Sequence, residues 1–146
     1  MACGLKFFFD NCMSPRLVEA LAALDLFHED KLVHLRDDNR FTLESSDNYI
    51  YSTLAKDSPM PVFVTADRAQ KTRGSVERQA LRASGLTVVF FAKDYARLNI
   101  HSQALVTIKA WPQIRDAVKR CAVPTIFDVS SHAKVTPLFG TESLKV

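Results

Sequence analysis

Strand-like and helix-like segments alternate along most of this chain. Short apolar runs of strand length occur at residues 5–9, 32–35, 62–65 and 86–91. Segments with apolar residues at helical spacing follow these runs, at residues 14–25, 46–56, 75–84 and 102–120. Such alternation is typical of a parallel β-sheet with helices on both faces. We therefore predict an α/β fold with a mainly parallel central sheet.

The C-terminal part continues this pattern in a weaker form. Residues 125–129 and 135–138 are short alternating runs, which predict peripheral strands in a hairpin. Pro112 lies inside the last predicted helix and is expected to bend or divide it. Because 146 residues is the length of one domain, we predict a single domain with a core over about residues 5–120 and an extension over 121–146.

Composition excludes several classes of protein. The hydrophobic fraction is 47% and the charged fraction is 24%, which is ordinary for a globular chain and argues against disorder. No apolar run reaches the length of a bilayer span, so no membrane partner is expected. The N-terminus lacks the pattern of a secretory signal, and we expect a cytoplasmic protein. The net charge of +3 is far below that of a dedicated nucleic-acid binder.

Motifs for several kinds of chemistry are missing from the sequence. The three cysteines form no C-x-x-C pair, and the four histidines have no metal-site spacing. The four glycines are too far apart to form a phosphate-binding loop. The sequence therefore argues against a disulfide framework, a zinc site and a glycine-rich nucleotide site.

Acidic residues follow two of the predicted strands and begin one of the predicted helices. Asp10 directly follows the first strand, Asp67 lies just beyond the third strand, and Asp47 begins the second helix. Ligands of open parallel sheets bind at the carboxyl ends of the strands, so these three carboxylates can meet in one cleft. Neighbouring carboxylates favour a cation, and oxygen donors without imidazole or thiolate favour Mg²⁺ or Mn²⁺. The alternative is that the three acids are separate helix caps and turn residues.

Basic and aromatic residues near these acids are candidates for contacts with a nucleic acid. Five basic residues follow Asp67 within a short stretch, namely Arg68, Lys71, Arg73, Arg78 and Arg82. This stretch can hold phosphates, although most charge runs are solvated surfaces. Phe41, Tyr49 and Tyr51 can stack on exposed bases or can belong to the core.

The same segments resemble the PIN-like nuclease domains, particularly the compact VapC-like toxin branch. Residues 8–17 are similar to the opening strand, Asp-Asn pair and Pro-Arg-Leu helix start of that branch. Further similarity lies at residues 33–37, at the Thr-x-Asp strand end within residues 62–68, and at residues 77–81 and 110–114. The resemblance implies a three-layer α/β/α sandwich that cleaves RNA with acid-bound Mg²⁺ or Mn²⁺. It also implies that residues 1–146 form one PIN-like domain.

The resemblance also implies roles for individual residues. The candidate catalytic and metal-binding acids are Asp10, Asp47 and Asp67, with Asp37 as a further metal-site residue. The candidate substrate-binding residues are Asn11, Arg36, Arg68 and Arg73. Asp10 matches the first acid of the family and Asp67 matches the strand-end acid. Asp47 stands where the family has an Asp-x-Glu-Trp-like stretch.

Three partners are expected on this reading. RNA is the substrate, and a cognate antitoxin would cover the acidic cleft. The apolar face around Leu105, Ile108 and Trp111 either belongs to the core or supports a homodimer.

Two other functions stay open. Many PIN domains have a further acid beyond the Thr-x-Asp element, where residues 69–71 are Ala, Gln and Lys in this chain. A PIN-like domain with weakened catalysis would instead be an RNA-binding or protein-interaction module. A phosphoacceptor signalling domain also places acids at strand ends, but its usual Lys-Pro pair after a late strand is missing here.

Overall fold

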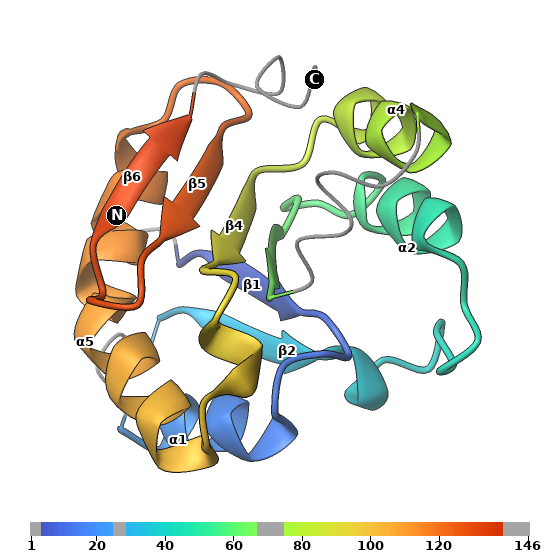
Figure 1. The fold of residues 1–146 in the computed structure, drawn as a ribbon. Helices are drawn as coiled ribbons and strands as arrows, with labels where there is room; N and C mark the ends of the chain where they lie inside the picture. The colour runs from blue at the N-terminus through green and yellow to red at the C-terminus, as the bar shows by residue number, and fades with distance from the viewer. Residues whose placement is uncertain (1–3, 25–28, 67–74, 139–146) are drawn as a thin grey trace.

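The computed structural model describes residues 4–24, 29–66 and 75–138 of the chain (Figure 1). Its strands are β1 (Lys6–Phe9), β2 (Lys31–His34), β3 (Val62–Thr65), β4 (Val88–Phe91), β5 (Ile126–Val129) and β6 (Val135–Leu138). Its helices are α1 (Pro15–Leu24), α2 (Asp47–Leu54), α4 (Ser75–Ser84) and α5 (Ile100–Arg120), with short 3-10 turns η1 (Leu35–Asp37) and η2 (Tyr95–Arg97). None of the described helices combines the length and apolar character that a bilayer crossing requires.

The six strands form one sheet in the order β2-β1-β3-β4-β5-β6. Strands β1 to β5 pair in parallel, and β6 pairs antiparallel with β5. The C-terminal hairpin predicted from the sequence is present, and its first strand is built into the parallel sheet. Ile126 of β5 lies in the core on one face, while Phe127 and Val129 lie in the core on the other face.

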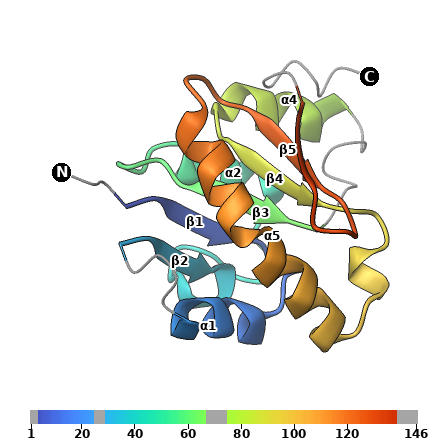
Figure 2. The ribbon, with the colours of Figure 1, turned by 90° about the vertical axis from the view of Figure 1, so that its left-hand side faces the viewer.

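Helices cover both faces of this sheet, as Figures 1 and 2 show together. Phe7 and Phe9 of β1 pack on one face with α1 and α5, whereas Phe8 packs on the other face with α2 and α4. Strands buried on both faces are apolar at almost every position, which is why they appear in the sequence as continuous apolar runs. The chain therefore folds as the predicted α/β sandwich with one apolar core on each face of the sheet.

Helix α5 runs without a break although Pro112 lies inside it. Asn99 caps its start, because the Asn99 side-chain oxygen accepts a hydrogen bond from the Ser102 N–H at 2.9 Å. Proline removes one backbone donor from the helix, but the neighbouring Trp111 is buried against the rings of Phe7 and Phe9. Trp111 before the proline and Ile114 after it are both buried in the core, which keeps the helix on the sheet, so the predicted division of the helix is not seen.

A cluster of surface charges holds the loop between η1 and α2. The guanidinium of Arg40 pairs with Asp38 at 2.8 Å and with Asp57 at 2.7 Å, and Lys6 lies 3.5 Å from Asp57. Hydrogen bonds from Arg40 are the main reason that the pKa values of Asp38 and Asp57 are lowered. The cluster ties the start of this loop to the segment that leads from α2 into β3.

We expect this cluster to stabilise the protein at neutral pH and to lose its effect in acid. A carboxyl whose folded-state pKa is lowered contributes stability above the unfolded pKa, about 3.9 for Asp, and loses it as the pH falls through the folded-state pKa. Urea unfolding of wild type and Arg40→Gln checks this. The difference in the free energy of unfolding should be largest near neutral pH and shrink below about pH 4. A difference that is independent of pH would contradict this account.

Candidate functional site

The carboxylate of Asp10 is buried at the carboxyl end of β1. The Asp10 N–H donates to the carbonyl of Val64 at 2.9 Å, which extends the pairing of β1 with β3 by one residue. One carboxylate oxygen of Asp10 accepts a hydrogen bond from the hydroxyl of Thr65 at 2.9 Å. The other oxygen accepts from the Asn11 N–H at 2.8 Å. These bonds fix the orientation of an acid that is only 7% exposed.

Cys12 links the loop after β1 to the end of β3. Its sulfur lies 3.5 Å from the Asp10 carboxylate oxygen that accepts from Thr65, and 3.2 Å from the hydroxyl of Thr65. The Ala66 N–H donates to the same sulfur at 3.3 Å. Although Cys12 as a residue is exposed, desolvation of its sulfur, followed by the charge of Asp10, raises the pKa of the thiol to about 11. The thiol is therefore protonated at neutral pH.

Asp47 reaches the same edge of the sheet because it begins α2. The Ser46 hydroxyl caps this helix by accepting from the Tyr49 N–H at 3.2 Å. Ile50 and Leu54, four positions apart, are buried and anchor one face of the helix in the core. An acid in the first turn is favoured by the helix dipole, so Asp47 also suits the local structure.

A cleft of about 230 Å³ brings the ends of these elements together. Its walls contain Asp10, Asn11 and Cys12 after β1, Leu35 of η1, Thr42, Leu43 and Ser45 of the loop before α2, and Asp47 and Ile50 of α2. Three residues that the sequence nominated therefore share one cleft, namely Asp10, Asn11 and Asp47. The cleft lies at the carboxyl end of the parallel strands, where open α/β sheets bind their ligands.

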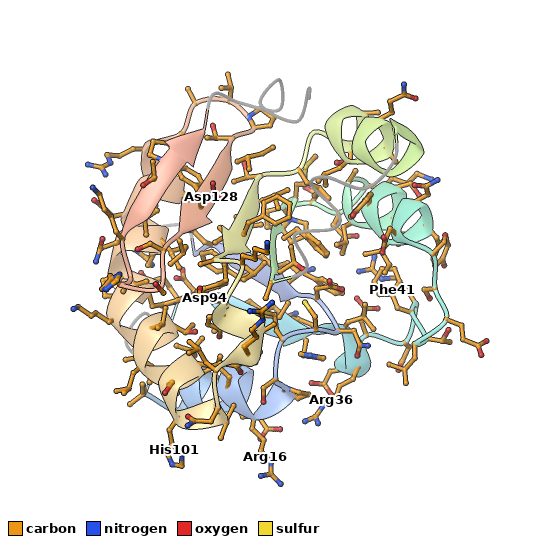
Figure 3. The ribbon with its side chains drawn as sticks, viewed as in Figure 1. Arg16, Arg36, Phe41, Asp94, His101 and Asp128 are labelled. Atoms are coloured by element: carbon orange, nitrogen blue, oxygen red, sulfur yellow. The ribbon has the colours of Figure 1, made fainter. Side chains whose placement is uncertain are left out.

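Asp37 and Arg36, which the sequence also nominated, lie outside the walls of this cleft. Both residues are in η1, where their side chains are 62% and 47% exposed. Arg36 pairs with Glu19 at 2.6 Å and with Asp37 at 3.5 Å. Figure 3 shows Arg36 projecting outward beside η1. The 3-10 turn after β2 directs these side chains to the surface instead of into the cleft.

The remaining nominated residues, Asp67, Arg68 and Arg73, lie outside the described residues. Among the residues that the structure does describe, no group of three His, Cys, Asp or Glu side chains is arranged to hold a metal ion. The described part of the cleft thus contributes two acids, Asp10 and Asp47.

Sequence reasoning missed several contacts in and near the cleft. The sequence assigns no role to Cys12 and shows Thr65 only within the Thr-x-Asp strand end, yet both contact the carboxylate of Asp10. Thr65 contacts Asp10 because of the strand register: Val64 pairs with Phe9, so the next residues, Thr65 and Asp10, lie opposite each other. The signal in the sequence is that Thr65 ends the third apolar run, as Asp10 follows the first. Asp94 is a further acid that closely follows a strand, and it lies exposed at the start of η2 after β4 (Figure 3).

Comparison with known families identifies the class of domain that this fold and cleft define. A family model described as a PIN-like domain matches residues 5–93, and the chain belongs to that family. The matched region includes β1 to β4 and all the described residues that line the cleft. PIN-like domains are generally nucleases, and they generally use divalent metals. Neither the curated proteins nor the solved structures gave a match to the chain.

Proposed function

We propose that this chain is a metal-dependent ribonuclease whose active site is the cleft between Asp10 and Asp47. The observation that carries the proposal is the convergence of these two acids in one hollow of about 230 Å³ at the carboxyl end of the sheet. Membership of a generally nucleolytic family gives this arrangement its chemical meaning. We further propose that the protein acts in the cytoplasm as the toxin of a toxin-antitoxin pair.

The donor set of the cleft fits a hard divalent cation. Asp10 and Asp47 would hold the ion together with Asp67, and carboxylate oxygens are the ligands that Mg²⁺ and Mn²⁺ prefer. The sulfur of Cys12 is a poor competitor, because these hard cations prefer oxygen ligands to sulfur. When bound, the ion supplies Lewis-acid stabilisation of a phosphodiester and lowers the pKa of a coordinated water.

The surrounding residues hold the acids and the substrate. Thr65 and the Asn11 N–H orient the Asp10 carboxylate before any ligand arrives. The Asn11 side chain lines the cleft and can donate a hydrogen bond to a phosphate oxygen. Arg68 and Arg73 are proposed to contact phosphates beside the cleft. We assign no substrate contact to Arg36, because its guanidinium pairs with Glu19 and Asp37 away from the cleft.

A matched pair of variants tests this assignment of the acids. Asp47→Asn removes a carboxylate from the cleft wall, whereas Asp37→Asn removes an exposed one from η1. Loss of groups that only orient a metal ligand costs about 10–100-fold in affinity or activity. We therefore expect Asp47→Asn to lower Mn²⁺-dependent RNA cleavage by more than about tenfold. Asp37→Asn should cleave like wild type.

The readout is a Mn²⁺ titration of the cleavage of a mixed cellular RNA pool, with EDTA as the metal-free reference. Equal activity of Asp47→Asn and Asp37→Asn would remove Asp47 from the site. Equal loss in both variants would place Asp37 in the site despite its exposure. Metal-dependent cleavage that is absent from every folded preparation would contradict the nuclease proposal itself.

A second function is supported by the sequence beyond Asp67, where residues 69–71 are Ala, Gln and Lys and supply no further acid. Such a sequence fits a PIN-like module that binds RNA or protein with weakened catalysis. RNA binding in EDTA separates the two functions. A module binds equally well with and without metal and cleaves nothing, whereas the nuclease turns RNA over only when Mn²⁺ is added.

The toxin role requires an antitoxin that inhibits the enzyme, and the cleft is where we expect it to bind. An antitoxin that inhibits the enzyme would cover the cleft and place a basic side chain between Asp10 and Asp47, where a cation is favoured. Growth arrest on expression, relieved by co-expression of a neighbouring small open reading frame, would support this role. We separately propose a homodimer through the exposed part of α5. Trp111 is buried in the core and is not available for such a contact, whereas Leu105 is 71% exposed.

A further inference from the structure

Tyr49 is an exposed aromatic ring beside the proposed active site. Of the three aromatic residues between positions 41 and 51, Phe41 and Tyr51 are buried in the core, whereas Tyr49 is 48% exposed. Phe41 and Tyr49 make an edge-to-face contact, with ring centroids 5.8 Å apart and planes at 74°. The guanidinium of Arg40 lies 5.4 Å from the ring centre of Phe41. Phe41 therefore supports Tyr49 from the protein side and leaves ring surface facing solvent.

The exposed ring borders a hollow of about 520 Å³ between α2 and α4. On the α2 side, Asn48 and Ser52 lie next to Tyr49 and offer an amide and a hydroxyl. On the α4 side, the described lining residues are small, namely Ala80, Ala83 and Ser84. The hollow thus combines an aromatic wall, a small apolar wall and hydrogen-bonding groups, which are the elements that an unpaired nucleobase uses.

This hollow and the proposed active site lie on different sides of the first turn of α2. Asp47 lines the cleft, and the next two residues, Asn48 and Tyr49, line the hollow. A helix rises about 1.5 Å and turns by about 100° per residue, so Asp47 and Tyr49 are about 3 Å apart along the axis but point to nearly opposite sides of it. An RNA strand with a phosphodiester in the cleft would therefore reach the hollow by crossing the first turn of α2, with a flanking base on the far side.

The ion pairs around the cleft also favour a stacking contact. Arg36 and Arg40 lie in the segment between β2 and α2 that contributes to the cleft walls, and both are paired with carboxylates. Their charges are therefore largely compensated within the protein. Base stacking supplies affinity that needs no free cation, and it tolerates any base because every base has a π-face.

We propose that Tyr49 is a stacking platform for an unpaired RNA base next to the scissile phosphate, with Asn48 and Ser52 contacting the edge of that base. The proposal rests on the proposed function, because it takes RNA as the substrate. It assigns the α2–α4 hollow to single-stranded RNA rather than to a protein helix. Tyr49 then contributes to substrate affinity without touching the metal site.

The test is equilibrium binding of a short single-stranded RNA that carries 2-aminopurine, measured in EDTA so that no cleavage is required. Stacking of this base on an aromatic ring quenches its fluorescence. We expect Tyr49→Ala to weaken binding about tenfold and to abolish the quenching. Tyr49→Phe keeps the ring and should bind like wild type. Val123→Ala alters an exposed apolar residue between α5 and β5 and serves as the control.

Tyr49→Leu keeps an apolar contact with Phe41 and provides a second variant if Tyr49→Ala does not fold. Equal affinity and quenching in wild type and Tyr49→Leu would overturn the proposal. Loss of binding in Tyr49→Phe as well as in Tyr49→Leu would also overturn it, because stacking does not need the hydroxyl. The nuclease proposal fails separately: quenching that depends on Tyr49 without any Mn²⁺-dependent cleavage would leave the platform in place on a binding module.

Discussion

Asp10→Asn is expected to reduce Mn²⁺-dependent RNA cleavage by more than about a hundredfold while leaving the fold intact. Removing a residue that merely orients a metal ligand costs about 10–100-fold, so loss of a ligand itself should exceed that range. The amide of asparagine is nearly isosteric with the carboxylate. Its oxygen can still accept the hydrogen bond from Thr65 or from the Asn11 N–H. The loss would therefore reflect the missing negative charge.

Initial cleavage rates at saturating Mn²⁺, together with thermal unfolding, measure this effect. Asp116→Asn is the matched control, because Asp116 is an exposed acid of α5 whose partner is Arg120, far from the cleft residues in the sequence. Cleavage by Asp10→Asn within a few-fold of wild type would place the active site elsewhere. A large drop in thermal stability would show instead that the buried carboxylate has a structural role.

Replacing Arg115 with alanine is expected to lower the free energy of unfolding by about 3–5 kcal/mol. Arg115 of α5 is buried, and its guanidinium donates to the carboxylate of Asp30 at 2.6 Å and to that of Glu29. The Asp30 side chain is 0% exposed and also accepts from the Leu5 N–H at 2.8 Å. Without Arg115, the Asp30 charge would remain buried and lose its cation. The uncompensated charge is the main source of the expected loss.

Urea unfolding of Arg115→Ala and Arg120→Ala provides a matched comparison on one helix. Arg120 pairs with Asp116 at 3.4 Å, but both side chains are exposed, and such a pair contributes only about 0.3–0.5 kcal/mol. We therefore expect Arg115→Ala to lower the free energy of unfolding several-fold more than Arg120→Ala does. A loss below about 1 kcal/mol in Arg115→Ala would mean that the Asp30 region relaxes and hydrates the carboxylate.

The fold was predictable because its signals are local. The apolar runs before Asp10 and around Phe63 are buried on both faces, and such runs are visible in the sequence without knowledge of their neighbours. The pairing of β5 with β4 was less accessible. Its register is set by contacts between residues more than thirty positions apart, such as Phe90 and Asp128. A short alternating run near the C-terminus does not encode which strand it joins.

The candidate site was predictable only in part, because strand ends fix some side chains and loops fix others. Asp10 and Asp47 belong to a strand end and a helix start, so their positions follow from regular structure. The wall that encloses them comes from residues 42–45, in a loop tied by the Arg40 cluster, and no sequence period reports such ion pairs. The same limit explains Asp37, since the rule for strand ends did not anticipate the 3-10 turn.

The order of the strands gives the cleft an origin that does not depend on its acids. From β1 the chain first continues to β2 on one side and then returns to β3 on the other side. This reversal of winding direction is a topological switch point, where the loops that leave adjacent strands diverge and open a crevice. The crevice beside Asp10 is thus a property of the chain path. A descendant of this domain that lost every acid would keep the crevice and could use it to bind a different ligand.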